Sequence, residues 1–205
     1  MRRRLSMRRA ECRDGESGLA LIETAIVAPF LILLMLGIWE FSNGWQSNLA
    51  IQTSVRAGAR TGSGLGNDRA ADYAVLQAVK AGMTDFATSD VQTVVVYKAS
   101  AANGDPPPGC LTGTSSAALS CNVYTGAELN TLTLGAFTGT AATGCTGTAP
   151  DRFWCPTTRS VSQANPEYIG VYVRALSRYQ TGFFPGTGIT VEKNMVMRIE
   201  PKVEA

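Results

Sequence analysis

The sequence predicts an α+β protein: a long amino-terminal transmembrane helix leading into a small extracytoplasmic domain, with a helix packed on an antiparallel sheet and a disulfide-bonded excursion. Three observations predict this class. Residues 18–41 are almost continuously apolar, three later segments are rich in strand-forming residues, and four of the five cysteines lie between the first and second of these segments. We expect four parts: a basic leader (1–18), the membrane helix (19–41), an amphipathic helical extension (42–60) and the extracytoplasmic domain (61–205).

The apolar run is long enough to cross a bilayer, which takes about 20 predominantly apolar residues. Six arginines precede it, namely Arg2, Arg3, Arg4, Arg8, Arg9 and Arg13. The first basic residues after it are Arg56 and Arg60, so the positive-inside rule places the amino terminus in the cytoplasm and the rest outside. We expect a single-pass protein of the cell membrane. The alternative, a cleaved signal peptide, has a shorter apolar core and a small-x-small site, unlike Ser42–Trp45.

Two residues are unusual for a plain anchor. Glu23 puts an ionisable group near the start of the run, and Pro29 removes a backbone hydrogen bond inside it, which predicts a helix kink. Gly18, four apolar residues that begin with Leu19, and then Glu23 resemble a type IV prepilin processing site. Cleavage after Gly18 would let the new terminal ammonium pair with Glu23 of a neighbouring subunit. In the alternative, Glu23 lies at the cytoplasmic boundary of an uncleaved anchor, and both interpretations stay open.

A wider stretch, residues 16–60, resembles the TadE-like family of tight-adherence (Flp) pilus systems. The matching features are Gly18, Glu23, Ala28-Pro29, the leucine-rich tract, Gly37, Glu40-Phe41 and Arg56-Ala57-Gly58-Ala59-Arg60. The resemblance implies a pilin-like structural component (a minor pilin or pseudopilin) of such a system. Its implied partners are other pilin-like subunits, the pilus assembly machinery, a prepilin peptidase and the lipid bilayer. The alternative function is a signal-anchored extracytoplasmic module that binds a cell-surface ligand and is not part of a pilus.

The cysteines indicate disulfides rather than metal or redox chemistry. Cys110, Cys121, Cys145 and Cys155 form no C-x-x-C pair, which argues against a zinc ribbon or a thioredoxin-type centre. In an exported domain an even number of cysteines favours two disulfides. Three connectivities exist for four cysteines, and we expect the local one, Cys110 with Cys121 and Cys145 with Cys155. Cys12 falls in the leader.

Periodicity and turn residues divide the remainder of the chain. We expect an apolar helical stripe through Phe41, Trp45, Leu49, Gln52 and residues 55–59, and a break over residues 61–66. A second helix, capped by Asn67 or Asp68, should run to about Ala81. Strands are predicted at residues 91–98, 168–176 and 189–199, the last two as a hairpin, and a short helix or turn at 124–130. Phe153-Trp154 should pack over a disulfide or the sheet, with an exposed binding tip as the alternative.

Composition argues against several function classes. The chain has no histidine, which removes the commonest general base and metal ligand. Asp85, Asp90, Asp151 and Glu167 are scattered and are interpreted as surface or turn residues. The net charge is +2 without a basic patch, so nucleic-acid binding is not expected. We therefore expect no enzyme, no cofactor and no metal site.

Overall fold

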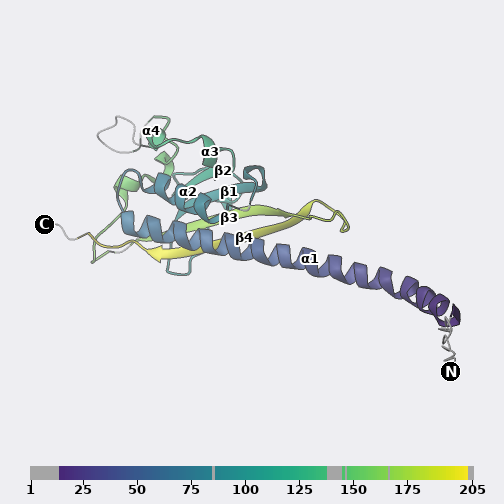
Figure 1. Ribbon diagram of the computed structural model, residues 1–205. Helices are drawn as coiled ribbons and strands as arrows, with labels where there is room; N and C mark the ends of the chain where they lie inside the picture. Colours follow the sequence, from purple (N-terminus) through teal and green to yellow (C-terminus); the bar gives the residue numbers. More distant parts are fainter. Residues whose placement is uncertain (1–13, 85, 138–144, 146, 166, 203–205) are drawn as a thin grey trace, which may run out of the picture. The chain divides into compact units, whose positions relative to one another are not determined.

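The computed structural model describes residues 14–84, 86–137, 145, 147–165 and 167–202 (Figure 1). The leader arginines, Cys12 and Asp85 lie outside the described residues. The elements, in chain order, are α1 (Asp14–Leu65), α2 (Ala71–Gly82), η1 (Thr88–Asp90), β1 (Val91–Ala99), η2 (Pro108–Cys110), β2 (Cys121–Thr125), α3 (Glu128–Thr131), α4 (Leu134–Phe137), η3 (Arg152–Trp154), η4 (Pro156–Thr158), β3 (Tyr168–Arg178) and β4 (Gly188–Arg198). The chain divides into two compact units, residues 1–41, called here the apolar unit, and residues 42–205, called the domain.

The domain is built on a four-stranded antiparallel sheet with the order β2-β1-β3-β4. β3 and β4 pair over their whole length, from Tyr168 opposite Arg198 to Arg178 opposite Gly188. The predicted α+β class and the predicted hairpin are therefore confirmed. Sequence reasoning missed β2, an edge strand that pairs with β1 from Thr93↔Thr125 to Tyr97↔Cys121. The short helix or turn predicted at 124–130 was wrong at its start, because Tyr124 belongs to β2 and α3 begins at Glu128.

One face of the sheet carries the main core, under the domain part of α1 and α2 (Figure 1). Alternate residues of β3 point into it, as the two-residue period of a strand requires, namely Ile169, Val171, Val173 and Ala175. Burial of each such aliphatic side chain stabilises the fold by about 1.5–3 kcal/mol. α1 contributes Ile51, Val55 and Ala59, which recur every four residues and so share one helical face. The predicted apolar stripe is confirmed at Val55 and Ala59, which are buried, but it was wrong at Trp45 and Leu49, whose side chains are exposed.

The predicted break over residues 61–66 was also wrong for most of its length, because α1 continues to Leu65. Two glycines near the end of α1, Gly58 and Gly62, allow the helix to pack closely against α2 and β3. A Cβ at Gly58 would lie 2.7 Å from Val79 Cγ2, and one at Gly62 would lie 2.6 Å from Ile169 Cδ1. The helix ends where Gly66 takes a positive φ of 56°, a conformation that glycine adopts at little cost.

α2 begins later than the sequence predicts. Its first helical residue is Ala71, and its amino-terminal cap, Ala70, makes no side-chain capping bond. Asp68 Oδ1 instead accepts a hydrogen bond from the Ala70 amide at 2.8 Å. The aspartate therefore stabilises the turn that precedes the helix, which explains why a capping residue was expected there.

The opposite face of the sheet carries a second, smaller core. It comprises Val95, Tyr97, Ala99, Tyr172 and the Cys110–Cys121 disulfide. Tyr97 lies opposite Gly170 in the register of β1 and β3, and a Cβ on Gly170 would meet the Tyr97 ring. The Tyr97 hydroxyl donates to the Gly104 carbonyl at 2.9 Å. Together with the second disulfide, Cys145–Cys155, this core confirms the predicted disulfide-bonded excursion.

Candidate functional site

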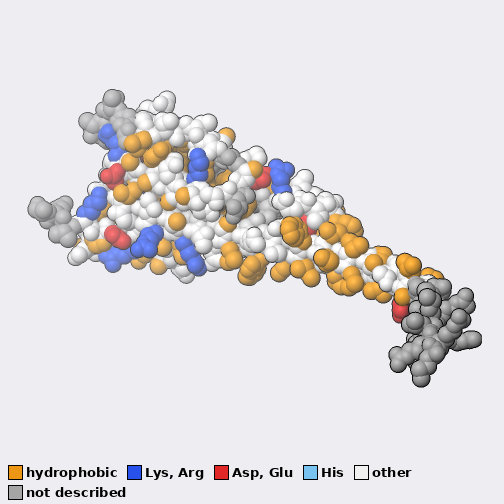
Figure 2. Space-filling view, viewed as in Figure 1, with side chains coloured by type: hydrophobic (Ala, Val, Ile, Leu, Met, Phe, Trp, Pro, Cys, Tyr) orange, Lys and Arg blue, Asp and Glu red, His pale blue; other side chains and the backbone are white. Residues whose placement is uncertain are grey.

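The apolar unit contains the first candidate surface. Along it large apolar side chains are exposed, namely Leu19, Leu21, Ile22, Ile26, Val27, Phe30, Leu31, Ile32, Leu33, Leu34, Met35, Ile38, Trp39 and Phe41. Six of them, residues 30–35, are consecutive, so they surround the helix rather than forming one stripe. Figure 2 shows apolar side chains along the face of this helix that is turned to the viewer. A helix that is apolar all round is buried in protein or lipid. Among the described residues, α1 is the one helix long and apolar enough to cross a membrane.

The predicted processing residues lie at the start of this surface. Gly18, Leu19 and Glu23 all belong to α1, and their side-chain positions are exposed. The neighbouring Thr24 hydroxyl donates to the Ala20 carbonyl at 2.8 Å, so it is satisfied within its own helix. Glu23 is thus the ionisable group that this surface presents to its surroundings. Processing after Gly18 stays a prediction.

Pro29 lies inside α1, within the same surface. Its ring nitrogen carries no hydrogen, so the Ala25 carbonyl loses the bond that an ordinary residue would supply. In a membrane a freed backbone carbonyl is costly unless a neighbouring group satisfies it. A kink at Pro29 stays a prediction.

The second candidate is a buried polar cluster in the domain. Asp72, on α2, is fully buried and accepts three side-chain hydrogen bonds. The donors are Arg159 Nη2 at 2.6 Å, Asn122 Nδ2 at 2.8 Å and the Tyr124 hydroxyl at 2.9 Å. The Arg159 side chain is also fully buried, so the Asp72–Arg159 ion pair is removed from water. Burial, and after it the Asp72 charge, raises the pKa of Tyr124 well above its ordinary value, which keeps its hydroxyl a donor.

This cluster attaches residues 154–159, which include Cys155 of the second disulfide, to the sheet. Asn122 Oδ1 accepts from the Trp154 amide at 2.9 Å, and Asn122 Nδ2 donates to the Trp154 carbonyl at 3.0 Å. The Arg159 guanidinium lies 4.0 Å from the centre of the Trp154 ring. Trp154 itself is buried in the main core. The expectation that Phe153-Trp154 packs inward therefore holds for Trp154, and an exposed tip is excluded there.

Asp151 is the unusual member of this region. Its side chain is fully buried, and both carboxyl oxygens lack a hydrogen-bond partner among the described residues. Burial, followed by the negative charge of Asp72, raises its pKa from 3.8 to about 7. Asp151 lies in a turn, as one of the two predicted alternatives has it, but the other alternative, a surface position, was wrong. A surface position was also wrong for Asp90, which is buried and pairs with Arg178 at 2.5 Å. Glu167 is half-buried and pairs with Lys98 at 2.6 Å.

These hydrogen bonds and ion pairs join separate segments of the domain, which is a structural role. Sequence reasoning missed the cluster because its members come from residues 72 to 159, and no local motif joins them. Within the described ranges no group of three or more His, Cys, Asp or Glu side chains is placed to hold a metal ion. A cavity of about 370 Å³ lies beside the end of α2. Lys80 is the charged residue among the described residues that line it, so these residues provide no acid–base pair.

Comparison with known families identifies the amino-terminal part of the chain. Residues 18–60 match the family model described as TadE-like protein. Neither the curated proteins nor the solved structures gave a match. The matched range contains Gly18, Glu23, Pro29 and the close-packed Gly58, and the resemblance inferred from the sequence is thereby confirmed. Residues 18–60 of this chain are a TadE-like segment.

Proposed function

We propose that this protein is a membrane-anchored, pilin-like structural component, a minor pilin or pseudopilin, of a tight-adherence (Flp-type) pilus assembly or secretion system. TadE-like proteins are associated with such systems, and they are structural rather than enzymatic. The observation that carries the proposal is the apolar unit. Its side chains are apolar and exposed around the whole helix, within the segment that matches the family.

The proposed orientation puts the amino terminus in the cytoplasm and the domain outside. The arginines before the apolar unit support it through the positive-inside rule. The two disulfides of the domain support it independently, because disulfides persist in oxidising, extracytoplasmic compartments. The domain would then face other subunits outside the membrane.

In this proposal Glu23 is an assembly residue. A carboxylate in a bilayer needs a cationic or hydrogen-bonding partner, and the free amino terminus of a neighbouring processed subunit supplies one. Other pilin-like subunits and the assembly machinery are the partners, and a prepilin peptidase would cut between Gly18 and Leu19. Mass spectrometry of the mature protein tests the cut. A terminus at Leu19 supports processing, whereas an intact leader makes this protein an anchored assembly factor.

The role of Glu23 is tested by Glu23→Ala in the producing cell. We expect unchanged membrane insertion, because removing a charge from an apolar helix favours insertion. Incorporation into pili should fall about a hundredfold or more, because removing one partner of a buried ion pair costs about 3–5 kcal/mol. The matched control is Thr24→Ala, which removes an adjacent polar group that bonds only within its own helix in the structure. Normal piliation of the Glu23→Ala strain would refute the assigned role.

A second function remains in competition because the family match ends at residue 60, before most of the domain. The domain would then be a binding module for a cell-surface ligand, and the helix only its anchor. Exchanging residues 18–41 for an unrelated membrane helix distinguishes the two. Retained function favours the module, and lost pilus assembly with normal membrane insertion favours the pilin-like component.

A further inference from the structure

The tip of the β3–β4 hairpin is an exposed aromatic surface that neither core uses. Its residues run from Tyr179 to Ile189, and Phe183 and Ile189 are 60% and 51% exposed. Phe184 is also exposed, and its ring lies 5.5 Å from that of Tyr179. No charged residue occurs between Arg178 and Glu192. Scattered exposed apolar residues are ordinary, but an uncharged aromatic hairpin tip indicates an interaction surface.

The tip has a defined backbone. The Tyr179 amide donates to the Thr187 carbonyl at 3.2 Å, which closes the loop above the last β3–β4 pair. Gly182 and Gly186 take positive φ values of 64° and 96°, so glycine is needed at both turning points. Phe183 and Phe184 therefore lie between two glycine turns, in a loop closed by a backbone hydrogen bond.

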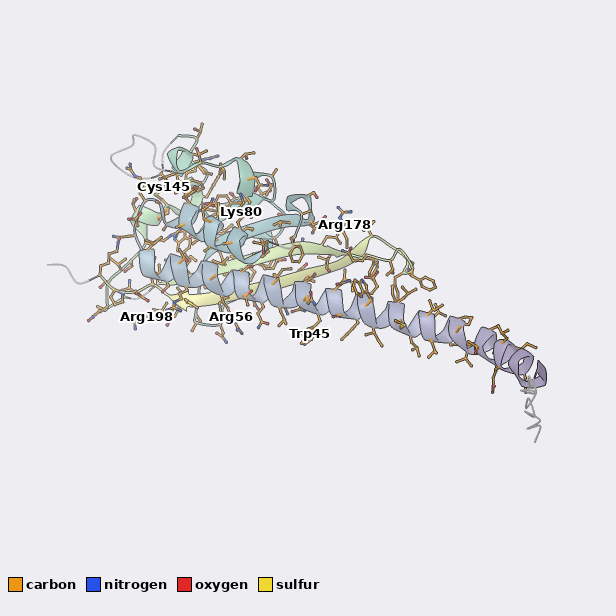
Figure 3. The ribbon with its side chains drawn as sticks, viewed as in Figure 1. Trp45, Arg56, Lys80, Cys145, Arg178 and Arg198 are labelled. Carbon is orange, nitrogen blue, oxygen red and sulfur yellow. A yellow bond between two sulfur atoms is a disulfide. The ribbon has the colours of Figure 1, made fainter. Side chains whose placement is uncertain are left out.

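The hairpin points toward the end of the domain where α1 enters it. Along the α1–β3 contact, Gly62 approaches Ile169, Gly58 approaches Val171, and the Ser177 hydroxyl donates to Ser47 at 2.9 Å. Residue numbers fall along α1 as they rise along β3, so the two elements are antiparallel. In Figure 3, accordingly, Trp45 and Arg178 lie at one end of the domain and Arg198 at the other.

The tip continues the sheet at that end. Ser47, beside Ser177, is five residues from Ser42, the first residue of the domain, which is a helical rise of about 7 Å. β3 ends at Arg178, and the chain runs on through residues 179–187 before β4 begins at Gly188. Trp45, 58% exposed, lies on the same short stretch of α1. One end of the domain thus presents Trp45 and the aromatic tip, and the chain continues from this end directly into the apolar unit.

We infer that the hairpin tip, residues 179–189, is a second membrane contact that inserts Phe183 and Phe184 into the headgroup region of the bilayer. The inference rests on the proposed membrane span of the apolar unit. Aromatic side chains collect at membrane interfaces, and apolar faces settle about 5–10 Å deep in the boundary between headgroups and acyl chains. A lipid surface fits better than a protein partner, because the tip lies at the end covalently joined to the span and lacks the charges that orient protein interfaces.

The consequence is a domain held to the bilayer at two points. A single helix leaves the attached domain free to tilt about its point of entry. A hairpin tip in the interface fixes that tilt and thereby the faces that the domain presents to neighbouring subunits.

Quenching of tryptophan fluorescence by lipid tests the contact. The full chain is reconstituted at low protein density into phosphatidylcholine vesicles, brominated near the top of the acyl chains or unbrominated. The parent is Trp39→Phe with Trp45→Phe, which leaves the buried Trp154 as a constant background. Phe183→Trp is added to this parent. Its matched control is Leu119→Trp, an exposed apolar position in the loop beyond the carboxyl end of β1, at the opposite end of the sheet.

We expect brominated lipid to lower the added emission of the Phe183→Trp variant about twofold or more, since bromine quenches at contact and the tip lies at that depth. The Leu119→Trp emission should stay unchanged. A third variant that keeps only Trp39 and Trp154 reports on the span. Quenching of Trp39 without quenching at position 183 would overturn the hairpin contact and leave the anchor standing. If Trp39 is not quenched, both the membrane span and the hairpin contact are overturned. If the tryptophan at position 183 is protected from quenching only at high protein density, the tip contacts a neighbouring subunit instead of lipid.

Discussion

The apolar unit and the domain depart from the usual distribution of side chains in opposite ways. The apolar unit exposes Leu, Ile and Phe around a whole helix, whereas the domain buries a fully desolvated ion pair between Asp72 and Arg159. Each departure is explained by what surrounds the side chains. Lipid makes exposed apolar residues favourable, and a complete set of hydrogen bonds makes a buried carboxylate tolerable. The two units therefore fold and insert by different forces, and mutations should separate them.

The largest expected effect in the domain comes from Asp72→Ala. It leaves the Arg159 guanidinium buried without its counter-charge, and breaking a buried ion pair in this way costs about 3–5 kcal/mol. We expect that loss in the free energy of unfolding in urea, followed by circular dichroism on the full chain in detergent. Membrane insertion should not change.

The control for this substitution removes both charges at once. Replacing Asp72 by Leu together with Arg159 by Met leaves no isolated buried charge, and such exchanges are often close to neutral. The double variant should recover much of the lost stability, although Arg159 also donates to the Trp154 carbonyl at 3.1 Å. A single variant as stable as the parent would show that the ion pair does not support the domain.

The sequence predicts the parts of each unit that depend on local pattern. Dense β-branched residues identify β1, β3 and β4, and an uninterrupted apolar run identifies the membrane-compatible helix. β2 escaped prediction because its five residues, Cys121–Thr125, include two polar side chains and gain stability only from pairing with β1. Its partner lies far along the chain, so no local signal marks it.

The same distinction between local and long-range information separates the two candidate sites. Gly18, Leu19 and Glu23 are recognisable because their order along six residues carries the information. The Asp72 cluster is not, because it exists only after α2, β2 and the segment around Arg159 have come together. Asp151 illustrates the difficulty, since it follows Pro150 in a turn-like context that ordinarily lies at the surface, yet it is fully buried.

A smaller effect is expected where α1 joins the domain. Gly58→Ala introduces a Cβ 2.7 Å from Val79 Cγ2, whereas Gly64→Ala meets its nearest atom, Glu200 Oε2, at 4.0 Å. Alanine favours a helix over glycine by up to about 1 kcal/mol at either position. Overpacking at Gly58 costs about 1–3 kcal/mol. The thermal unfolding midpoint should therefore be higher than the parent's for Gly64→Ala and lower for Gly58→Ala. Equal stability of the two variants would show that α1 is not tightly packed at Gly58.

A further effect is a pH dependence of the stability of the domain. The pKa of Asp151 rises from 3.8 to about 7 because the carboxyl is buried and lies near Asp72, whose effect Arg159 and Arg69 offset in part. Between about pH 4 and 7 the unfolded chain releases this proton and the folded domain keeps it. Stability from this group is therefore greatest below pH 4, declines as the pH rises to about 7, and is constant above.

Asp151→Asn should remove this decline, because an amide does not ionise. We expect the variant to exceed the parent by up to about 4 kcal/mol at pH 8, because the pKa rises from 3.8 to about 7 at about 1.4 kcal/mol per pKa unit, and to match it below pH 4. Unfolding in urea at both pH values measures the difference. Because the exposed Glu128, on α3, accepts from the Thr125 amide and hydroxyl, Glu128→Gln is a control for carboxylate loss without burial. A parent whose stability does not change from pH 4 to 8 would mean that the Asp151 carboxyl reaches water. Asp151 would then no longer be an example of a charged group buried in the domain, in contrast with the exposed apolar side chains of the apolar unit.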